Sequence, residues 1–474
     1  MGIHLNELQR FLKNFFFMIG ASAINTLVGI AITSHLSSAL GVEGFGKYNF
    51  ILTYVSYFIF LTSLGTDVVA VRTIAMEKEK AKDVLGNLIL LKLILSMIAF
   101  CIILIPAFFV NKISNYGWIL VIFALPCLII PLNSVSTFFE ATKKMEYFSF
   151  ASVFMTIINY VLLYIFVKTP DNLFNAGLIN LLTSLIVPLT LNLIFFVMHG
   201  EIRFNLNKNM LRNLLTKGLI IGFIQITIMM IHYFNISILG FMKGDREVGL
   251  FSSAYRAFWL PVSFLGIFHT LIIPILSENY VENFSKYKSA FKSYQKIIIF
   301  ITFPLSIILI FFPEFYLKLF FNLDIYYESI ICFQLLVVSL ALISINVSFA
   351  QGLLTSHSEK KLLFIVIVQL SLNILSNIIL VQKYDIKGSA ISLIIAEVIG
   401  LLFYYSFFRK IYKINTMEII FKASVATIAM SLFIYFTKMH FIPCVMIGII
   451  IYLLTLLLLK GYKKEELIEY KNHI

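Results

Sequence analysis

Long apolar stretches recur along the whole chain, and they constrain its fold more than any other feature. They run from Asn14 to Lys460 with short polar breaks between them, and each has the ~20 residues that a helix needs to cross the ~30 Å hydrocarbon layer. Backbone amides inside lipid find no water, so only helices and closed barrels span a membrane. The stretches are continuously apolar and do not alternate as barrel strands do, which predicts helices.

The predicted fold is an all-α polytopic membrane protein with about 14 transmembrane helices. Composition agrees, because 60% of the residues are apolar and 13% are charged, against about 25% charged residues in soluble domains. The first stretch contains Ala21-Ser22-Ala23, which resembles a signal-peptidase site, but it continues well past these residues and predicts an uncleaved helix. The predicted spans are residues 14–36, 48–70, 84–110, 116–141, 148–167, 173–197, 217–240, 248–276, 294–313, 326–352, 361–381, 387–408, 417–437 and 442–460.

The basic residues that give the net charge of +13 are concentrated in alternate loops and at the two ends of the chain. Of the 37 Lys and Arg residues, 25 lie in the N-terminus, in alternate loops or in the C-terminal tail, and nine lie in the other loops. This positive-inside bias predicts an even number of crossings with both termini in the cytoplasm. The basic loops therefore indicate anionic membrane lipids as neighbours, and no nucleic-acid partner is expected.

The second half of the chain repeats features of the first half. GFGKY at residues 44–48 is echoed by VGLF at 248–251, and NYVLLY at 159–164 is echoed by NILSNI at 373–378. Such an internal repeat predicts two six-helix lobes in the same orientation around a central cavity, which is a common transporter arrangement. The predicted divisions are an N-lobe at 1–200, a C-lobe at 201–412, and a terminal helix pair with a cytoplasmic tail at 413–474.

Motifs for nucleotide hydrolysis and metal chemistry are absent from the sequence. It contains no G-x-x-x-x-G-K-[ST], H-E-x-x-H or C-x-x-C motif, so we expect no cofactor, no metal site and no enzyme activity. The outer loops are also too short to form an external catalytic domain. Energy for transport is therefore expected from an ion gradient or from the substrate itself.

Arg256 is the sharpest candidate for a binding residue. It lies roughly 12 Å below the outer end of the 248–276 span at 1.5 Å per residue, which is too deep for easy snorkelling to water. It shares a helix face with Ser252 and Trp259, in a small and polar stripe suited to a cavity or a tight interface. The alternative is a buried Arg that pairs with a carboxylate such as Glu397.

Other charged residues fall in or near the spans. Lys92 is a second candidate ligand for an anion, although its long stem could carry its charge to the cytoplasmic surface. Glu397 lies mid-span and is interpreted either as a proton or cation site or as the partner of a basic residue. Asp67 and Arg72 flank the inner end of the 48–70 span, as interfacial anchors or as a gate pair.

Uncharged polar residues also share helix faces. Gln225 and His232 lie seven residues apart and project from one face, so they could line a cavity and His232 could carry a proton. Asn25 belongs to a small polar stripe in the 14–36 span. Interhelical packing explains such residues at least as well as ligand contact does.

Several runs carry a family resemblance. LGVEGFGKY at residues 40–48, with VRTIA at 71–75, resembles the start of bacterial polysaccharide flippases of the O-antigen (Wzx) type. The similarity continues through residues 249–277 and the KGSA run at 387–390. These proteins belong to the multidrug/oligosaccharidyl-lipid/polysaccharide exporter superfamily.

The run YRAFWLP at residues 255–261 also resembles lipid II flippases of that superfamily. In those proteins the corresponding Arg is one of the cationic cavity residues associated with the lipid-linked diphosphate, a role that the resemblance carries onto Arg256. The chain departs from them where Asn25 and Ser22 replace a basic residue. It also has fewer cavity cations, which argues against a lipid II substrate.

The resemblance implies a fold like that of multidrug and toxic compound extruders, located in the bacterial cytoplasmic (inner) membrane. The implied function is alternating-access transfer of an undecaprenyl-diphosphate-linked oligosaccharide to the outer leaflet, coupled to H⁺ or Na⁺. Polysaccharide polymerases and chain-length proteins are the expected protein partners.

Other functions stay open at this point. A cation-coupled multidrug extruder shares the fold but would need an anionic cavity, whereas the deep charges here are mainly basic. A lipid II flippase is the next alternative. A membrane polysaccharide polymerase or glycosyltransferase would need larger outer loops, and a structural scaffold would leave the depth of Arg256 unexplained.

Overall fold

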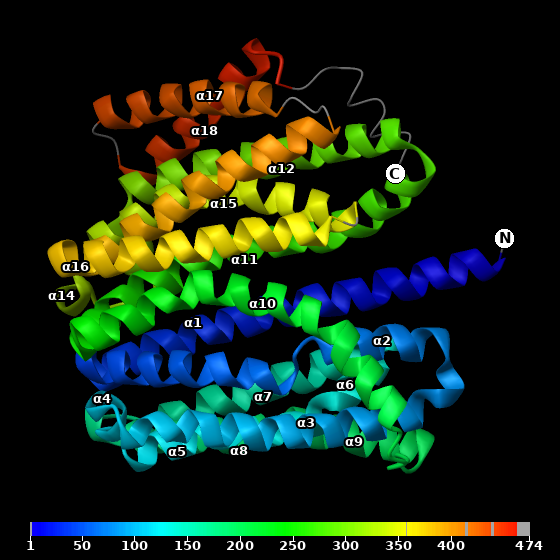
Figure 1. Ribbon diagram of the computed structural model, residues 1–474. Helices are drawn as coiled ribbons and strands as arrows, with labels where there is room; N and C mark the ends of the chain where they lie inside the picture. Colours follow the sequence, from blue (N-terminus) through cyan, green and yellow to red (C-terminus); the bar gives the residue numbers. More distant parts are fainter. Residues whose placement is uncertain (1, 357, 413–415, 438–439, 462–474) are drawn as a thin grey trace. The chain divides into compact units, whose positions relative to one another are not determined.

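The structure is a computed structural model that describes residues 2–356, 358–412, 416–437 and 440–461. In these ranges the chain forms α-helices and short 3-10 helices, and it contains no β-strand (Figure 1). The predicted all-α fold is therefore confirmed.

The helices differ widely in length, from single turns in loops to long continuous rods. The α-helices are α1 (Gly2–Ile59), α2 (Thr66–Met76), α3 (Ala81–Leu104), α4 (Asn111–Ser114), α5 (Trp118–Ala124), α6 (Ser136–Ala141), α7 (Glu146–Phe166), α8 (Leu173–Ser184), α9 (Ile186–His199), α10 (Lys208–Met242), α11 (Asp245–Glu282), α12 (Phe284–Phe311), α13 (Pro313–Leu317), α14 (Leu323–Tyr326), α15 (Ser329–Thr355), α16 (Glu359–Tyr412), α17 (Met417–Phe436) and α18 (Phe441–Leu458). The 3-10 helices are η1 (Phe60–Thr62), η2 (Lys78–Lys80), η3 (Ile105–Phe108), η4 (Leu125–Val135) and η5 (Pro170–Asn172).

Eleven helical segments of the described residues are long and apolar enough to cross a membrane. Two of them, Gly20–Thr62 and Glu359–Arg409, span 43 and 51 residues, about twice the length that one crossing needs. Each contains a break in the helical backbone, at Gly41 (φ 66°, ψ −179°) and at Asp385 (φ 48°, ψ −131°). The protein is thus a multi-pass membrane protein, and the count of about 14 crossings stays a prediction.

The chain divides into two compact units. Unit 1 comprises Met1–Ser252 and Phe320–Ile325, and unit 2 comprises Ser253–Leu319 and Tyr326–Ile474. The division falls inside α11, whereas the predicted lobes divide at residue 200, and the lobe boundaries stay a prediction. The first turns of α11 belong to unit 1 because they pack against α1, where a Cβ on Gly249 would lie 2.0 Å from the backbone oxygen of Val42.

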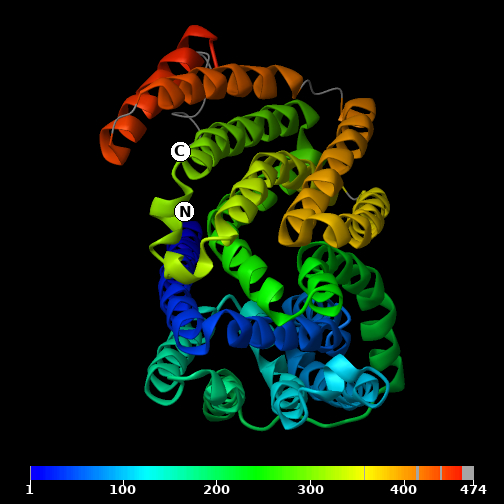
Figure 2. The same cartoon turned by 90° about the vertical axis from the view of Figure 1, so that its left-hand side faces the viewer.

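Unit 1 is a layered bundle. In it α1 packs along α7 and α10, α3 packs along η4, and α2 lies against α6 and α10 (Figures 1 and 2). An apolar core joins α2, α3, α6, α9 and α10, and Leu88, Phe139 and Phe195 are at most 1% exposed in it. This core holds α2 and α3 together and so positions the charged residues of the two helices.

Unit 2 has α12, α15 and α16 packed side by side, with α17 and α18 beside α12 (Figures 1 and 2). Its core includes stacked rings, with the centroids of Phe291 and Phe408 4.5 Å apart. Gly352 allows this packing, because a Cβ there would lie 2.6 Å from the Phe408 ring. Tyr287 Oη donates to the backbone oxygen of Gly352 over 3.1 Å, which fixes α12 to α15.

Glycines let backbones approach closely where helices of unit 1 cross. Gly65 combines two requirements, because it has a φ of 74° before α2 and a Cβ there would lie 2.4 Å from the backbone oxygen of Gly218. Only glycine adopts this conformation without strain. The nearest atoms of α10 are backbone atoms, which cannot move aside as a flexible side chain could. Gly65 therefore allows α10 to seat on the start of α2.

Replacing Gly65 by Ala is expected to destabilise the protein by about 2 kcal/mol or more, since strain and a backbone clash coincide. Detergent-solubilised protein unfolded by heat or by an SDS titration would measure this. Gly20→Ala is the matched control, because a Cβ at Gly20 meets no atom within 4 Å. Equal stability of the two variants would contradict the close approach described above.

Candidate functional site

Lys92 forms a buried ion pair in unit 1. Its side chain is 3% exposed on α3, and its Nζ lies 2.5 Å from Oδ1 of Asp67 in the first turn of α2, whose side chain is 36% exposed. The ammonium is thus held in place by a carboxylate and does not snorkel. The carboxylate of Glu140 on α6 lies near enough to Asp67 for the two like charges to interact.

The structure pairs Asp67 with Lys92, not with Arg72. Asp67 and Arg72 are five residues apart on α2, which places them on different faces of the helix. Arg72 is exposed. The predicted gate pair therefore does not form in this structure, and Asp67 and Lys92 instead fasten α2 to α3.

Removing either partner of the Lys92–Asp67 pair is expected to destabilise the protein, but by different amounts. Asp67→Asn leaves a buried ammonium without its counter-charge and is expected to cost about 3 kcal/mol, the lower end for a broken buried pair. Lys92→Met leaves a carboxylate on a side chain that is 36% exposed, so it should cost less, on the order of 1 kcal/mol. The double variant should recover most of the loss from Asp67→Asn.

SDS titration of the purified wild type, the two single variants and the double variant would measure these costs. An equal loss in both single variants would show that the burial of Lys92 does not set the cost. A double variant as unstable as Asp67→Asn would show that lost packing, not the uncompensated charge, is responsible.

The α11 stripe changes from buried to open along its length. Ser252 is 1% exposed, Arg256 and Trp259 are half-buried, and Ser263 and Gly266 are exposed. A Cβ at Gly266 would meet nothing within 4 Å. Arg256 therefore lies at the transition between the packed part of the helix and its open part.

Aromatic contacts in unit 2 fix the part of α11 that carries Arg256. The rings of Trp259 and Tyr255 are stacked, with centroids 5.9 Å apart and planes 23° apart. Tyr316 Oη on α13 donates to the backbone oxygen of Ala257 over 3.1 Å. These contacts involve the residues on both sides of Arg256. They therefore fix the backbone from which the Arg256 side chain extends.

Glu397 lies in a buried polar cluster of unit 2. Its side chain is on α16, the residue is 4% exposed, and its Oε2 accepts hydrogen bonds from Asn346 Nδ2 (2.6 Å) and Gln369 Nε2 (3.4 Å). Gly400 makes room for the second amide, because a Cβ there would lie 2.1 Å from Gln369 Nε2. Among the described residues Glu397 forms no ion pair, so the alternative in which it neutralises Arg256 is wrong for this structure.

The polar cluster around Glu397 is incompletely hydrogen-bonded by the described residues. Asn373 follows Gln369 by one turn on α16; it is fully buried, and neither atom of its amide has a partner among the described residues. Asn346 Oδ1 is likewise buried without a donor. Such groups cost about 1–3 kcal/mol each when unsatisfied, so they indicate a place for water or an ion.

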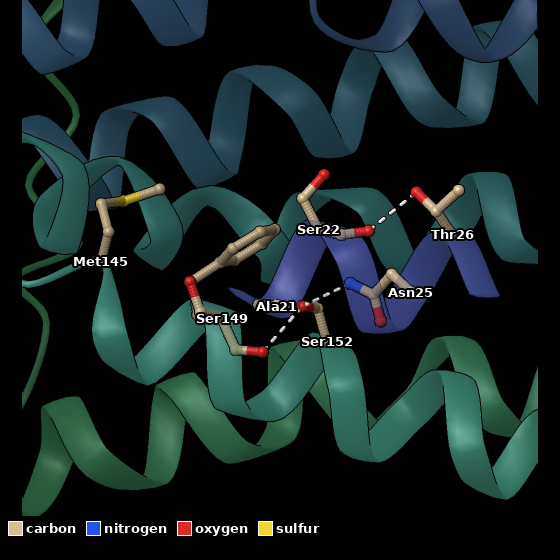
Figure 3. Close-up of a pocket in the computed structure, with 8 residues that line it drawn as sticks. Ala21, Ser22, Asn25, Thr26, Met145, Ser149 and Ser152 are labelled. Carbon is tan, nitrogen blue, oxygen red and sulfur yellow. Dashed lines mark hydrogen bonds between the residues drawn. The ribbon is translucent and has the colours of Figure 1, made fainter. Parts of the chain in front are cut away.

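Asn25 lies at a pocket of about 360 Å³ between α1 and α7 in unit 1 (Figure 3). Asn25 Nδ2 donates to Ser152 Oγ over 3.1 Å, and Ser152 Oγ donates to the backbone oxygen of Ser149 over 2.9 Å. Asn25 Oδ1 is buried and has no partner among the described residues. The pocket is lined by Ala21, Ser22, Asn25, Thr26, Met145, Phe148, Ser149 and Ser152.

The remaining predicted residues lie on α10, also in unit 1. Gln225 is exposed and His232 is half-buried, so the shared face that the spacing predicts is open at one end only. One and two turns before Gln225, Gly222 and Gly218 pack against Leu64 and Gly65. The structure therefore carries Gln225 and His232 on α10, the helix that packs on the start of α2.

Sequence reasoning missed a polar cluster elsewhere in unit 1. Asp245 Oδ1 at the start of α11 lies 2.6 Å from Lys112 Nζ and accepts from Tyr116 Oη over 2.9 Å. The Lys112 ammonium lies 4.9 Å from the centre of the Phe50 ring. The cluster therefore closes the start of α11 onto the α4 region.

Comparison with known proteins decides the family. The model of a family described as polysaccharide biosynthesis proteins matches residues 11–280, a little over half of the chain. The chain belongs to this polysaccharide biosynthesis protein family. A curated relative from Escherichia coli (strain K12), named putative O-antigen transporter, is 24% identical over 246 residues, which are 51% of the chain and 59% of the relative.

Solved structures of the multidrug/oligosaccharidyl-lipid/polysaccharide exporter superfamily share the fold. A lipid II flippase, MurJ, in an inward closed conformation matches with a TM-score of 0.76 at 18% identity, covering 94% of this chain and 98% of that protein. An inward-facing multidrug resistance transporter of the MATE family matches with a TM-score of 0.66 at 20% identity, covering 82% and 96%. This family member therefore shares the fold of these transporters, and the resemblance predicted from residues 40–48 and 249–277 is confirmed.

Proposed function

We propose that this protein is a flippase that moves an undecaprenyl-diphosphate-linked oligosaccharide from the cytoplasmic to the outer leaflet of the bacterial inner membrane. The family, the O-antigen relative and the flippase-like fold support a polysaccharide-precursor transporter. Both termini lie in the cytoplasm under this proposal, and alternating access moves the substrate without covalent chemistry. The protein is not an enzyme in this scheme and needs no cofactor.

The half-buried Arg256 on α11 carries the proposal. A diphosphate must leave water to cross the membrane, and a guanidinium can replace that water with two parallel charge-assisted hydrogen bonds. Charged side chains at membrane depth are rare and commonly mark substrate pathways. The open part of α11 beyond Arg256, at Ser263 and Gly266, leaves room for a bulky ligand beside it.

Glu397 is proposed as the ion-coupling group. Two amides fix one of its carboxylate oxygens, and the described residues supply no cation, so a proton or Na⁺ can provide the missing positive charge. The unsatisfied Oδ1 of Asn346, whose Nδ2 binds Glu397, offers a further ligand for an ion or its water. Binding and release of this ion would bias unit 2 between two arrangements.

A multidrug extruder is the second candidate, favoured by the MATE-like fold and by a buried carboxylate. Its cationic substrates would need exposed anionic groups, whereas Glu397 is 4% exposed and already accepts two amide hydrogen bonds.

Polysaccharide polymerases and chain-length proteins would act on the flipped product and are the partners that the flippase proposal implies.

Arg256→Ala should slow translocation of an undecaprenyl-diphosphate oligosaccharide in reconstituted vesicles at least about tenfold, because a charge-assisted pair is worth about 1.5–3 kcal/mol. Arg256→Lys should retain part of the rate, since Lys keeps the charge but not the bidentate geometry. Lys422→Met is the control, because Lys422 is already neutralised by Glu418 at 2.7 Å.

Two results would count against this assignment. Unchanged rates in both Arg256 variants would remove Arg256 from the site. A wild type that expels cationic dyes but moves no lipid-linked sugar would favour the extruder.

Glu397→Gln should abolish the response of translocation to an imposed H⁺ or Na⁺ gradient while leaving slow, gradient-independent exchange. The amide keeps the volume of the carboxyl group but cannot exchange a proton or hold the charge. Vesicles with each gradient imposed separately identify the ion. Glu418→Gln is the control, because Glu418 is half exposed. A retained gradient response in Glu397→Gln would place the coupling group elsewhere.

A further inference from the structure

We propose that the pocket between α1 and α7, defined by the eight lining residues given above, holds a neutral sugar residue of the lipid-linked substrate. This inference rests on the proposed flippase function and assigns to the substrate's glycan a site separate from Arg256. The pocket lies entirely within unit 1.

The chemistry of the lining excludes an ionic ligand. None of the eight lining residues is charged, so a diphosphate or an ammonium group would lose its hydration without a counter-charge. Five of the eight carry hydroxyl or amide groups, namely Ser22, Asn25, Thr26, Ser149 and Ser152. Such a lining fits a ligand that is rich in hydroxyl groups and carries no charge.

Hydrogen bonds within the pocket leave an acceptor for that ligand. Thr26 Oγ1 donates to the backbone oxygen of Ser22 over 2.8 Å, and Ser152 Oγ both accepts from Asn25 and donates to Ser149. Asn25 Oδ1 alone of the Asn25 amide atoms has no partner (Figure 3). Because this oxygen is buried, the Asn25 side chain has to rotate to present it to the pocket, where a sugar hydroxyl is a donor that would satisfy it.

The pocket also has an apolar side. Phe148 and Met145 line it, and the C–H faces of a pyranose ring pack well against such surfaces while its hydroxyls bond to the polar side. A volume of about 360 Å³ lies at the lower end of the range for small-molecule sites, which suits one or two sugar units but not a whole repeat unit.

The position of the pocket suits substrate loading. Ser152 lies six residues into α7, about 9 Å from the helix start at 1.5 Å per residue. That start follows Lys143 and Lys144, in a loop that the charge pattern assigns to the cytoplasm. The pocket is therefore near the side from which a newly made lipid-linked sugar would enter.

The test compares binding of two kinds of probe to the full-length protein in detergent. The probes are undecaprenyl diphosphate alone and undecaprenyl diphosphate that carries a single GlcNAc, GalNAc, glucose or galactose. Wild type is expected to bind at least one sugar-bearing probe about five- to tenfold more tightly than the bare lipid, the gain from one or two hydrogen bonds. This ratio isolates the sugar from the diphosphate.

Asn25→Leu removes the amide at similar volume and should abolish the ratio without changing the affinity for the bare lipid. Phe148→Leu should reduce the ratio, because it removes the flat face and keeps the apolar volume. Phe150→Leu is the control, since Phe150 is 76% exposed on α7 and does not line the pocket. Thermal unfolding of each variant shows whether it is folded.

The outcomes separate this inference from the proposed function. A wild type that binds no undecaprenyl diphosphate defeats the proposed function. A wild type that binds the bare lipid but shows no gain from any sugar, or an Asn25→Leu variant that keeps the gain, defeats the sugar site alone. Tighter binding of the bare lipid by Asn25→Leu would assign the pocket to the prenyl chain and would also overturn the inference.

Discussion

The hydrocarbon core of the membrane offers no hydrogen bonds, and the rest of this structure follows from that constraint. Every crossing segment must pair its own amides, so the described chain is helical wherever it is apolar. The hydrophobic effect does not favour helix association inside lipid. Helices therefore associate largely through close van der Waals packing. Gly46 and Gly249 illustrate this, because a Cβ on either would lie within 2.0 Å of a backbone oxygen on the helix it crosses.

The same constraint sorts the polar side chains into two classes. Lys92 is buried but fully compensated by Asp67, and such a pair mainly fastens two helices together. Asn373, Asn346 Oδ1 and Asn25 Oδ1 are buried without partners among the described residues. An unsatisfied group costs free energy that packing alone does not recover, so these positions mark where a ligand, an ion or water completes the structure.

The sequence predicted the elements better than the contacts between them. The predicted breaks between spans at 37–47 and 382–386 contain Gly41 and Asp385, where the long helices are interrupted. Apolar length and turn residues are local signals, so a single sequence carries them. The partner of Lys92 was missed because the packing of α2 on α3 selects it. Asn25 and Ser152 are 127 residues apart, and Asn346 and Glu397 are 51 residues apart, so no spacing marked the members of either pair as neighbours.

A lipid-linked glycan presents a doubly anionic group and a neutral one, and the two need different chemistry. A guanidinium recognises phosphate strongly through its charge, whatever sugar is attached. Neutral hydrogen bonds are weaker, at about 1 kcal/mol each, so each hydroxyl bound in a pocket such as that of Asn25 would change the affinity for a sugar by only a few fold. Affinity for the carrier lipid would then be set by Arg256, and selection among glycans by the α1–α7 pocket. Changes in that pocket could then alter the preferred glycan while leaving the fold and the handling of the diphosphate intact.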